Sequence, residues 1–435
     1  MFKLSEIASV LQGRFIGPDC DTIGAVTTDS RQARPGQLFF ALKGPNYDGH
    51  DFARQAFKKG GTGIVVEREI RDVSRQIVVT DTLQALGVLA NFYRRKFAPM
   101  VIAITGTNGK TTTKNLIGRI MQAQAKTVMT EGTLNNQIGL PLTLLGLTPE
   151  TRYCVLEMGT NHPGEIDYLC RIAQPDIGVL TNIGYGHLAG FRTRNDLVKE
   201  KLSLIQNLPP EGKAVVNAGI KSLWTSCTVV TFSLHRNARY HPARSVMDES
   251  GSTFYVGNNF YRTRLLGRSN VENIVCAIAT TQELGAPYAV QQPVIESIKP
   301  AAMRLEPVTI GSYFILNDCY NANPNSMKEA LLFLGSLKRR KVAVLGDMLE
   351  LGKSSITLHK RVGKLASKQV DILVTVGDQA EFYGGNHFAA RDQAIAFVTK
   401  QVRPGDAILF KASRALKFEE LVGPVVSYIK DQGGT

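Results

Sequence analysis

A short apolar run that opens into a glycine-containing turn constrains this chain more than any other stretch. Residues 101–104 are apolar and predict a strand buried on both faces. Apolar residues recur at helical spacing from Leu116 to Met121, so the turn leads into an amphipathic helix. Such a turn forms an anion site, because free backbone N–H groups and the positive end of the helix dipole face the ligand. The residues expected to bind ATP here are Gly106, Thr107, Asn108, Gly109, Lys110, Thr111 and Thr112.

The turn is a shortened relative of the Walker A phosphate loop. Two residues separate Gly106 from Gly109, where the general pattern has four. Lys110 would neutralise the outer phosphates, and the Thr111 hydroxyl would ligate Mg²⁺. The alternative is an ordinary glycine-rich turn with a surface lysine. The order of strand, loop, Lys-Thr pair and helix favours an ATP site over that alternative.

Length and the alternation of strand and helix patterns predict an α/β protein of three domains. Pro99 follows a helix predicted over residues 83–97 and marks the first boundary. We expect a small α/β module over residues 1–98, a central P-loop-type domain with a mainly parallel sheet over 99–307, and a doubly wound Rossmann-like domain over 308–435. Polar residues cluster at strand ends of the first module, which suits a bound ligand, with plain turn chemistry as the alternative. The last domain lacks Gly-x-Gly-x-x-Gly, so no dinucleotide cofactor is indicated.

Composition argues against several other classes of protein. No apolar run reaches the roughly 18–20 residues that span a bilayer, and the N-terminus lacks a signal-peptide pattern. The six cysteines have no Cys-x-x-Cys spacing and read as reduced core thiols. The net charge of +14 suits an anionic substrate, and a basic nucleic-acid-binding ATPase stays an alternative that no aromatic-interleaved stripe supports. We therefore expect a cytoplasmic monomer with no nucleic-acid partner and no membrane insertion.

Two polar residues follow predicted strands of the central region. Glu157 ends a strand predicted over residues 153–156 and is placed to ligate Mg²⁺ beside Thr111, unless it is a solvated carboxylate. His187 lies among glycines after a strand predicted over residues 177–183, which is unlike a histidine packed in a core. Taken alone, His187 is more simply a loop residue than a metal ligand.

A helix and a loop complete the pattern-based candidates. Lys199, Glu200 and Lys201 lie on a helix predicted over residues 196–208, and composition alone indicates a solvated face. Residues 346–352 follow a strand and predict an exposed loop that faces a crevice at the sheet edge, with a helix cap as the alternative.

Several motifs together closely resemble the Mur ligase family. They are the turn at residues 105–111, Glu157 in Glu-Met-Gly-Thr-Asn-His-Pro-Gly-Glu-Ile, Asn182-Ile-Gly followed by His187-Leu, and Gly-Arg-Ser-Asn-Val-Glu-Asn at residues 267–273. Arg304 and residues 318–327 continue the likeness, which covers nearly the whole chain. The resemblance implies an ATP-dependent amide ligase of bacterial cell-wall synthesis that uses Mg²⁺.

The resemblance also implies roles for individual residues. It puts Asn273 beside the adenine, Asp318 near the nucleotide ribose and Arg304 against the phosphates. It implies that CO₂ carbamylates a helix lysine, with Lys201 as the best match and Lys199 as the fallback. The implied catalytic residues are Lys110, His187, Lys201 and Arg304, and the implied ligands of two Mg²⁺ ions are Thr111 with Glu157 and His187 with modified Lys201.

Residues 318–327 resemble one branch of the family in particular. That branch joins D-alanyl-D-alanine to a UDP-N-acetylmuramoyl-tripeptide through an acyl phosphate, so these two molecules are the implied partners. The resemblance makes residues 1–98 the domain that binds the UDP-substrate. The implied substrate-binding residues are Ser30, Arg31, Asp48, Gly49, His50, Asn135, Asn136, Tyr320, Asn321 and Asn323. The metals and residues 320–323 lie on opposite sides of the junction near Arg304, so we expect the site to be assembled between two domains.

The chain departs from the family pattern at a few positions. Tyr185-Gly186 replaces Pro-Ala, Ala189 replaces a glutamate, Asn317-Asp318 replaces two aspartates, and Ala412 replaces a glycine. Other readings are another amino-acid ligase of the superfamily, including a folylpolyglutamate type, or a nucleotide-binding regulator without turnover. The Asp-Asn-Pro-Arg of the sibling that adds the third peptide residue is absent.

Overall fold

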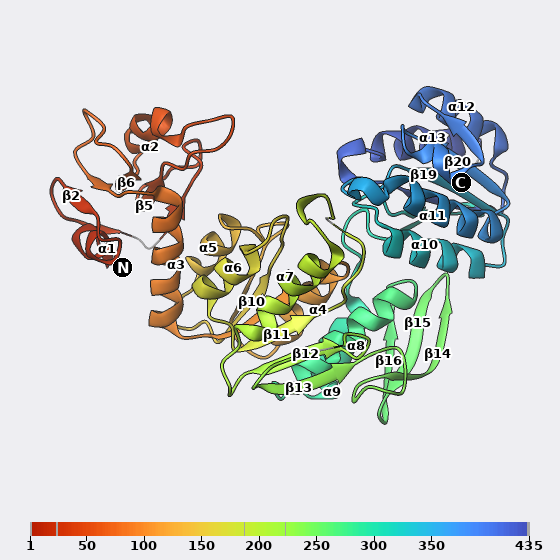
Figure 1. Ribbon diagram of the computed structural model, residues 1–435, viewed down its shortest axis with the longest axis horizontal. Coiled ribbons are helices and arrows are strands. Elements are labelled where there is room, and N and C mark those ends of the chain that lie inside the picture. Colours follow the sequence, from red (N-terminus) through yellow and green to blue (C-terminus); the bar gives the residue numbers. More distant parts are fainter. Residues whose placement is uncertain (1, 23–24, 187, 222, 433–435) are drawn as a thin grey trace.

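The computed structural model describes residues 2–22, 25–186, 188–221 and 223–432. Figure 1 shows three α/β parts that follow one another along the chain, with the amino-terminal and carboxy-terminal parts at opposite ends. The predicted α/β class with a parallel central sheet is confirmed. The exact domain limits at residues 98 and 307 stay predictions. Within the described ranges, no helix has the length and apolar character needed to cross a membrane.

The amino-terminal part is built on a five-stranded sheet with strand order β2-β7-β6-β5-β4. The Asp81 carboxylate accepts hydrogen bonds from the N–H groups of Leu83 and Gln84 and so starts α3, which ends just before Pro99 as predicted. The elements are β1 (Phe2–Lys3), α1 (Leu4–Val10), β2 (Arg14–Ile16), β3 (Asp21–Thr22), β4 (Ala25–Thr27), β5 (Gln37–Phe40), η1 (Gly49–Phe52), α2 (Ala53–Lys58), β6 (Gly63–Val66), β7 (Gln76–Val78) and α3 (Thr82–Phe97).

The central part contains a six-stranded, fully parallel sheet with order β13-β12-β11-β8-β10-β9. Its elements are β8 (Met100–Thr105), α4 (Lys110–Gln122), β9 (Thr127–Met129), α5 (Gly139–Leu144), β10 (Tyr153–Glu157), α6 (Glu165–Ala173), β11 (Ile177–Leu180), η2 (Leu188–Gly190), α7 (Arg194–Gln206), β12 (Lys213–Asn217), β13 (Thr228–Phe232), α8 (Arg268–Gln282) and α9 (Tyr288–Ser297).

Strand β8 lies between β10 and β11, and this order positions the site. Glu157 pairs with Ile104, and Leu180 pairs with Thr105, so three strands end at one edge of the sheet. In a parallel sheet this carboxyl edge is where ligands bind. The phosphate loop and Glu157 are therefore brought together by strand order alone.

A three-stranded antiparallel sheet packs beside the central part and was not predicted from the sequence. It consists of β14 (Pro242–Asp248), β15 (Gly251–Val256) and β16 (Asn259–Thr263). Phe254 and Tyr261 are completely buried and stack on each other with ring centroids 5.9 Å apart. These two rings anchor the sheet to the core that includes α8 and β13.

The carboxy-terminal part is the doubly wound sheet expected, with order β17-β18-β22-β19-β20-β21. Only the edge strand β17 is antiparallel to its neighbour among the described strands of this sheet, and an apolar core lies on each face. The elements are β17 (Glu306–Ile310), β18 (Tyr313–Asn317), α10 (Pro324–Ser336), β19 (Lys341–Gly346), η3 (Gly352–Ser354), α11 (Ser355–Gln369), β20 (Ile372–Val376), η4 (Ala380–Tyr383), β21 (Asn386–Phe388), α12 (Arg391–Gln401), β22 (Ala407–Lys411), η5 (Arg414–Leu416) and α13 (Glu419–Asp431).

The β14–β15 hairpin reaches from the central part to the carboxy-terminal part (Figure 1). Glu249, at the tip of this hairpin, accepts two parallel hydrogen bonds from Arg339, at 2.6 and 2.7 Å. Arg339 also donates to the carbonyl oxygen of Ser312 at 2.6 Å. Both charged side chains are partly buried, so this bidentate pair ties the hairpin to the last sheet more firmly than an exposed pair would.

We predict that Glu249 and Arg339 are energetically coupled across this contact. A double-mutant cycle with Glu249→Ala and Arg339→Ala should give a coupling of about 0.5–2 kcal/mol in the free energy of the least stable urea-unfolding transition. The exposed pair Lys126–Glu150, with a 3.4 Å contact, is the control and should give less. Equal coupling in the two cycles would contradict a clamp at the hairpin tip.

Candidate active site

The phosphate loop joins the end of β8 to the start of α4 along a tight backbone path. Gly106 has a φ of +149° and Gly109 a φ of +82°. A Cβ on Gly106 would lie 2.0 Å from the Thr181 hydroxyl oxygen, and one on Gly109 would lie 2.1 Å from the Asn273 amide oxygen. Both positions therefore require glycine on grounds of space and conformation.

Residues after β11 hold the phosphate loop in place. The Asn182 carbonyl accepts from the Thr107 N–H at 2.9 Å, and its side-chain oxygen accepts from the Asn108 N–H at 3.0 Å. The Thr181 hydroxyl donates to the Asn108 carbonyl at 2.6 Å. The strand predicted over residues 177–183 therefore ends early, at Leu180, because the next two residues bond to the loop.

Two lysine ammonium groups meet at one backbone oxygen. Nζ of Lys110 donates to the Gly106 carbonyl at 2.9 Å, and Nζ of Lys201 donates to the same oxygen at 3.1 Å. Burial lowers the pKa of Lys201 well below its ordinary value, the charge of Lys110 adds to this effect, and Glu200 opposes it. Burial also lowers the pKa of Lys110, against the attraction of Glu157.

Helix α7 does not present the solvated face that composition indicated. Lys199 is exposed, but Glu200 is only 6% exposed and Lys201 only 1%. Glu200 accepts hydrogen bonds from the N–H groups of Gly164 and Ile166, each at 2.7 Å. It thus caps the start of α6 from the following helix, a contact between residues 34 to 36 positions apart that no local pattern reveals.

Glu157 and Thr111 carry the oxygen atoms best suited to a cation. One carboxylate oxygen of Glu157 accepts from the Asn135 side chain at 2.9 Å, and the other is buried with no hydrogen-bond partner among the described residues. The Thr111 hydroxyl accepts from Arg304 at 3.1 Å. A buried carboxylate oxygen of this kind fits a divalent cation, and Mg²⁺ commonly takes one or two protein oxygens beside phosphate and water. The described residues contain no group of three or more His, Cys, Asp or Glu side chains arranged for a metal.

The site continues onto the carboxy-terminal part, as expected. The Asn108 and Asn323 side chains bond to each other through two hydrogen bonds, at 2.7 and 3.2 Å. The Arg304 guanidinium lies over the Tyr320 ring, 3.9 Å from its centre. These contacts bring the phosphate loop against residues 320–323 and so assemble one site from two parts of the chain.

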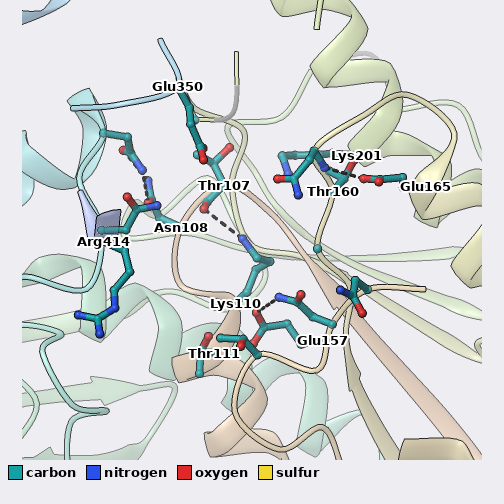
Figure 2. Close-up of a pocket in the computed structure, with 18 of the residues that line it drawn as sticks. Thr107, Asn108, Lys110, Thr111, Glu157, Thr160, Glu165, Lys201, Glu350 and Arg414 are labelled. Atoms are coloured by element: carbon teal, nitrogen blue, oxygen red, sulfur yellow. Dashed lines mark hydrogen bonds between the residues drawn. The ribbon is translucent and has the colours of Figure 1, made fainter. Parts of the chain in front are cut away.

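Two cavities open on either side of this contact. The main cavity, of about 570 Å³, contains Lys110, Thr111, Glu157, Thr160 and Lys201 on its central-domain wall (Figure 2). Its other predicted residues are Thr107, Asn108, Gly109, Asn135, Asn136, Arg304, Tyr320, Asn321 and Asn323. The second cavity, of about 430 Å³, is lined by Thr112, Asn273 and Asp318 and shares Asn108, Gly109, Arg304, Tyr320, Asn321 and Asn323 with the main cavity.

Asp318 is held by neighbours at the edge of the second cavity. One of its oxygens accepts from Lys411 at 2.6 Å, and the other accepts from the Leu305 N–H at 2.9 Å. Asn273 packs against Gly109, and its amide donates to the Asn270 side chain at 3.4 Å. Asp318 and Asn273 therefore both line the second cavity next to the phosphate loop.

The candidates of the amino-terminal part line neither of these two cavities. His50 is 3% exposed, its Nδ1 lies 2.6 Å from Asp48, and its Nε2 accepts from the Glu67 N–H at 2.8 Å. Burial alone would raise the pKa of Asp48, but hydrogen bonds from His50 lower it to about 2. A Cβ on Gly49 would lie 2.7 Å from the Leu42 backbone, so His50 and Gly49 shape the loop from within.

Ser30 and Arg31 differ in accessibility within the same part of the chain. Ser30 is 8% exposed, whereas the Arg31 side chain is exposed and pairs with Asp29 at 2.8 Å. His187, predicted as a catalytic and metal-binding residue, lies outside the described residues.

Three departures from the family pattern have local explanations or partners. A Cβ on Gly186 would lie 2.8 Å from the Thr107 methyl group, so this glycine fits the threonine of the phosphate loop. The Asn317 side chain accepts from the Cys319 N–H at 3.4 Å. Ala412 is fully buried, 2.7 Å from where a Cβ on Gly346 would lie.

Sequence reasoning missed several residues of the site, including Lys114, Glu350 and Arg414. Lys114 is 3% exposed and donates to the Thr130 carbonyl at 2.7 Å, and Thr130 in turn accepts the Glu157 N–H. Its place one helical turn after Lys110 was the available signal. Glu350 and Arg414 line the main cavity from distant loops, and only the Gly346–Gly352 motif pointed toward the first of them.

Comparisons with known proteins cover the same regions. Residues 22–94 match the Mur ligase family catalytic domain, residues 104–281 the Mur ligase middle domain, and residues 303–414 the Mur ligase glutamate ligase domain. The UDP-N-acetylmuramoyl-tripeptide--D-alanyl-D-alanine ligase of Bacillus subtilis is 35% identical, over 97% of this chain and 98% of the relative.

Solved structures agree in fold and extent. A crystal structure of MurF from Acinetobacter baumannii superposes with a TM-score of 0.91 at 32% identity, covering 98% of each chain. The MurF ligase of Thermotoga maritima, in complex with ADP, gives a TM-score of 0.87 at 26% identity over 94% of this chain and 98% of that one. On the combined strength of domain matches, full-length identity and fold, this chain belongs to the Mur ligase family.

Proposed function

We propose that this chain is the ATP-dependent ligase that joins D-alanyl-D-alanine to a UDP-N-acetylmuramoyl-tripeptide in peptidoglycan precursor synthesis. The names of full-length relatives at up to 35% identity support the substrates. The observation that carries the proposal is the main cavity, which joins a phosphate loop to a wall from the carboxy-terminal part. A ligase that activates one substrate and delivers another needs such a divided site.

ATP is the nucleotide used. The relative from Thermotoga maritima binds ADP, and the phosphate loop here supplies N–H groups and Lys110 for its phosphates. We assign the second cavity to the base and ribose, with Asn273 and Asp318 as their neighbours and Thr112 beside the phosphates. Arg304 lies at the meeting point of both cavities, where a transferring phosphoryl group would need a cation.

We assign Mg²⁺ to the oxygen ligands of the main cavity. Thr111 and Glu157 would hold one ion, since the buried oxygen of Glu157 and the hydroxyl lie beside Lys110 in one cavity. His187 and a modified Lys201 are the proposed ligands of a second ion. When bound, these ions supply charge neutralisation, which lets a carboxylate approach a triphosphate of the same sign.

A carbamate at Lys201 would resolve an electrostatic conflict in the unmodified site. Two ammonium groups donate to the Gly106 carbonyl, and Lys201 is buried against Lys110. The Lys201 ammonium would first lose a proton, and the resulting amine would attack CO₂ to form an N–C bond while one C=O electron pair moves onto oxygen. A second proton then leaves the nitrogen, so an anion replaces a cation. The resulting carboxylate would reach farther into the cavity than the amine does.

The UDP-linked substrate would span the amino-terminal and central parts. We assign Ser30 and Arg31 to its nucleotide end, with Asp48, Gly49 and His50 shaping the adjoining loop. Asn135 and Asn136 would meet its peptide end in the main cavity, and Tyr320, Asn321 and Asn323 would contact it or the amine from the opposite wall.

The proposed reaction has two chemical steps. A carboxylate oxygen of the tripeptide attacks the γ-phosphorus of ATP, and the bond to the β-phosphate oxygen breaks to give ADP and an acyl phosphate. The ammonium group of D-alanyl-D-alanine loses a proton, and the free amine attacks the acyl carbon. The nitrogen gives up a second proton, and the carbon–oxygen bond breaks to release phosphate. Lys110 and Arg304 stabilise charge on the transferring phosphoryl group, and the two walls of the main cavity would limit the access of water to the acyl phosphate.

We expect a cytoplasmic monomer divided at residues 98 and 307. The six cysteines are free, which suits a reducing compartment. A regulator without turnover would not need Lys110, Glu157 and Lys201 in one cavity, so their arrangement favours an enzyme.

The substrate assignment predicts a specific product pattern. A panel of UDP-muramoyl peptides and amine acceptors should give amide product, with stoichiometric phosphate release, only for a tripeptide combined with D-alanyl-D-alanine or a close analogue. Amide formed instead from a UDP-muramoyl dipeptide and a single amino acid would assign the chain to another member of the family. Phosphate release that ignores both substrates would contradict a ligase.

Replacing Lys110 should abolish catalysis without unfolding the chain. Lys110→Ala should lower turnover at least about a hundredfold, because it removes a preorganised cation at the transferring phosphoryl group. Arg119→Ala, which removes an exposed cation from the same helix, should leave turnover within about twofold. Circular dichroism checks folding, and near-normal turnover in a folded Lys110→Ala enzyme would contradict the assignment.

The turnover lost in Lys201→Ala should be partly restored by adding short carboxylic acids. Lys201→Ala should lose on the order of a hundredfold in turnover and regain part of it with short carboxylic acids, which fill the space of the carbamate. Lys199→Ala, on the exposed side of the same helix, should behave like the unmodified enzyme. Labelled CO₂ should add a carbamate signal by nuclear magnetic resonance that Lys201→Ala lacks, and its persistence in that variant would refute the proposal.

A further inference from the structure

The loop of residues 346–352 follows β19 and enters the main cavity, but the proposed function gives it no task. Leu349 and Glu350 line the cavity from the carboxy-terminal part. Figure 2 shows the Glu350 side chain directed toward Thr107 and the phosphate loop. The loop therefore places a carboxylate opposite the site of phosphoryl transfer.

Buried hydrogen bonds fix this loop from behind. Asp347 is 4% exposed and accepts from the N–H groups of Gln379 and Ala380, at 3.0 and 2.6 Å. The Leu349 N–H donates to the Ser413 hydroxyl at 2.8 Å. Asp347 thus caps the start of η4, which agrees with the helix cap given above as the alternative for residues 346–352. The next residues, Leu349 and Glu350, face the cavity. These hydrogen bonds hold the backbone from which the Glu350 side chain extends.

The Glu350 backbone also contacts the central part of the chain. Its φ is +63°, a left-handed conformation that costs energy in a residue other than glycine. Its carbonyl oxygen accepts from the Ala189 N–H at 3.0 Å, across the boundary with the central part. Such a conformation persists where the surroundings enforce it, commonly at ligand sites.

The charges on the carboxy-terminal wall match a zwitterion. Among the described residues from position 308 onward that line the main cavity, Glu350 is the one carboxylate and Arg414 the one cation. Nη1 of Arg414 donates to Glu419 at 2.6 Å, which fixes the guanidinium in the wall. The other residues of this wall are Tyr320, Asn321, Ala322, Asn323 and Leu349.

The acids on the opposite wall lie beside the phosphate loop or at the start of α6. Glu157 holds Asn135 and lies beside Lys110. Glu165 accepts from the N–H groups of Asn161 and His162, at 2.6 and 3.0 Å, at the start of α6. An amine approaching from the carboxy-terminal side, away from the phosphates, would meet Glu350 first.

We propose that Glu350 binds the ammonium group and Arg414 the carboxylate of the incoming D-alanyl-D-alanine. This inference rests on the proposed function and adds the residues that recognise its second substrate. The loop of residues 346–352 thereby positions the amine of the second substrate. The wall that carries Glu350 and Arg414 selects a short zwitterionic dipeptide over a neutral or singly charged amine. Each contact is a charge-assisted hydrogen bond.

The first test separates amine binding from activation. Glu350→Gln should raise KM for D-alanyl-D-alanine by about 10- to 100-fold, while KM for ATP and for the UDP-tripeptide stays within about twofold. With hydroxylamine as a small nucleophile, the variant should form hydroxamate from the acyl phosphate at the rate of the unmodified enzyme. Glu381→Gln, an exposed glutamate of the same part outside the cavity, is the control and should change neither readout.

The second test changes the substrate instead of Glu350. D-alanyl-D-alaninamide, which lacks the carboxylate, should have a KM about tenfold higher than D-alanyl-D-alanine with the unmodified enzyme and nearly the same KM as the dipeptide with Arg414→Ala. D-lactoyl-D-alanine, which carries a hydroxyl in place of the amine, should inhibit the unmodified enzyme at least about tenfold more weakly than a dipeptide inhibitor that keeps the amine. This last comparison needs no variant to fold.

The outcomes distinguish a failure of the Glu350 proposal from a failure of the proposed function. An unchanged KM for the dipeptide in folded Glu350→Gln, or equal inhibition by the amine and hydroxyl analogues, would overturn the recognition of the amine. Equal loss of hydroxamate and amide formation would show a structural role for Glu350 and also overturn it. If the unmodified enzyme forms no hydroxamate from ATP and the UDP-tripeptide, the proposed function itself fails, and this inference fails with it.

Discussion

The convergence of Lys110 and Lys201 on the Gly106 carbonyl is the constraint around which the site is built. Two lysine amines this close to one oxygen make an electropositive centre when both are protonated, so the charge of Lys110 opposes that of Lys201, and a triphosphate would offset the combined charge. Glu157 and Glu200 lie near these lysines and offset part of that charge. The positive centre thus explains why a nucleotide is expected to bind here. It also explains why the protonated form of Lys201 is disfavoured.

The position of that centre depends on strand order and on glycine. Because β8 lies between β10 and β11, Glu157 and the residues after Leu180 meet the phosphate loop without any long connection. Gly106 and Gly109 let the loop approach Thr181 and Asn273 more closely than any side chain would allow. The carboxy-terminal part then closes the site through Asn323 and Tyr320, and the Glu249–Arg339 pair links the same two parts at a distance.

Local sequence predicted the elements whose causes are local. The strand at residues 101–104, the glycine turn, the helix after it and the alternation of the last domain all follow from apolar spacing and turn chemistry. It could not predict the burial of Glu200 and Lys201, because the groups that bury them lie on other elements. The sheet of β14 to β16 was missed because the residues of β14 are exposed or half-buried, so its sequence offers no apolar run that predicts a strand. Glu350 and Arg414 come to line one cavity only in the folded chain, since they are more than sixty positions apart in sequence.

The most direct test of the account follows the oxygen atoms of the reaction. The tripeptide can be prepared with heavy oxygen in its terminal carboxylate and allowed to react with ATP and D-alanyl-D-alanine, and the released phosphate analysed by mass spectrometry. An acyl phosphate made at this site predicts one labelled oxygen in each phosphate, because the carboxylate oxygen leaves with the phosphoryl group. Phosphate without label, formed together with amide product, would contradict the account, because activation would then not pass through an acyl phosphate.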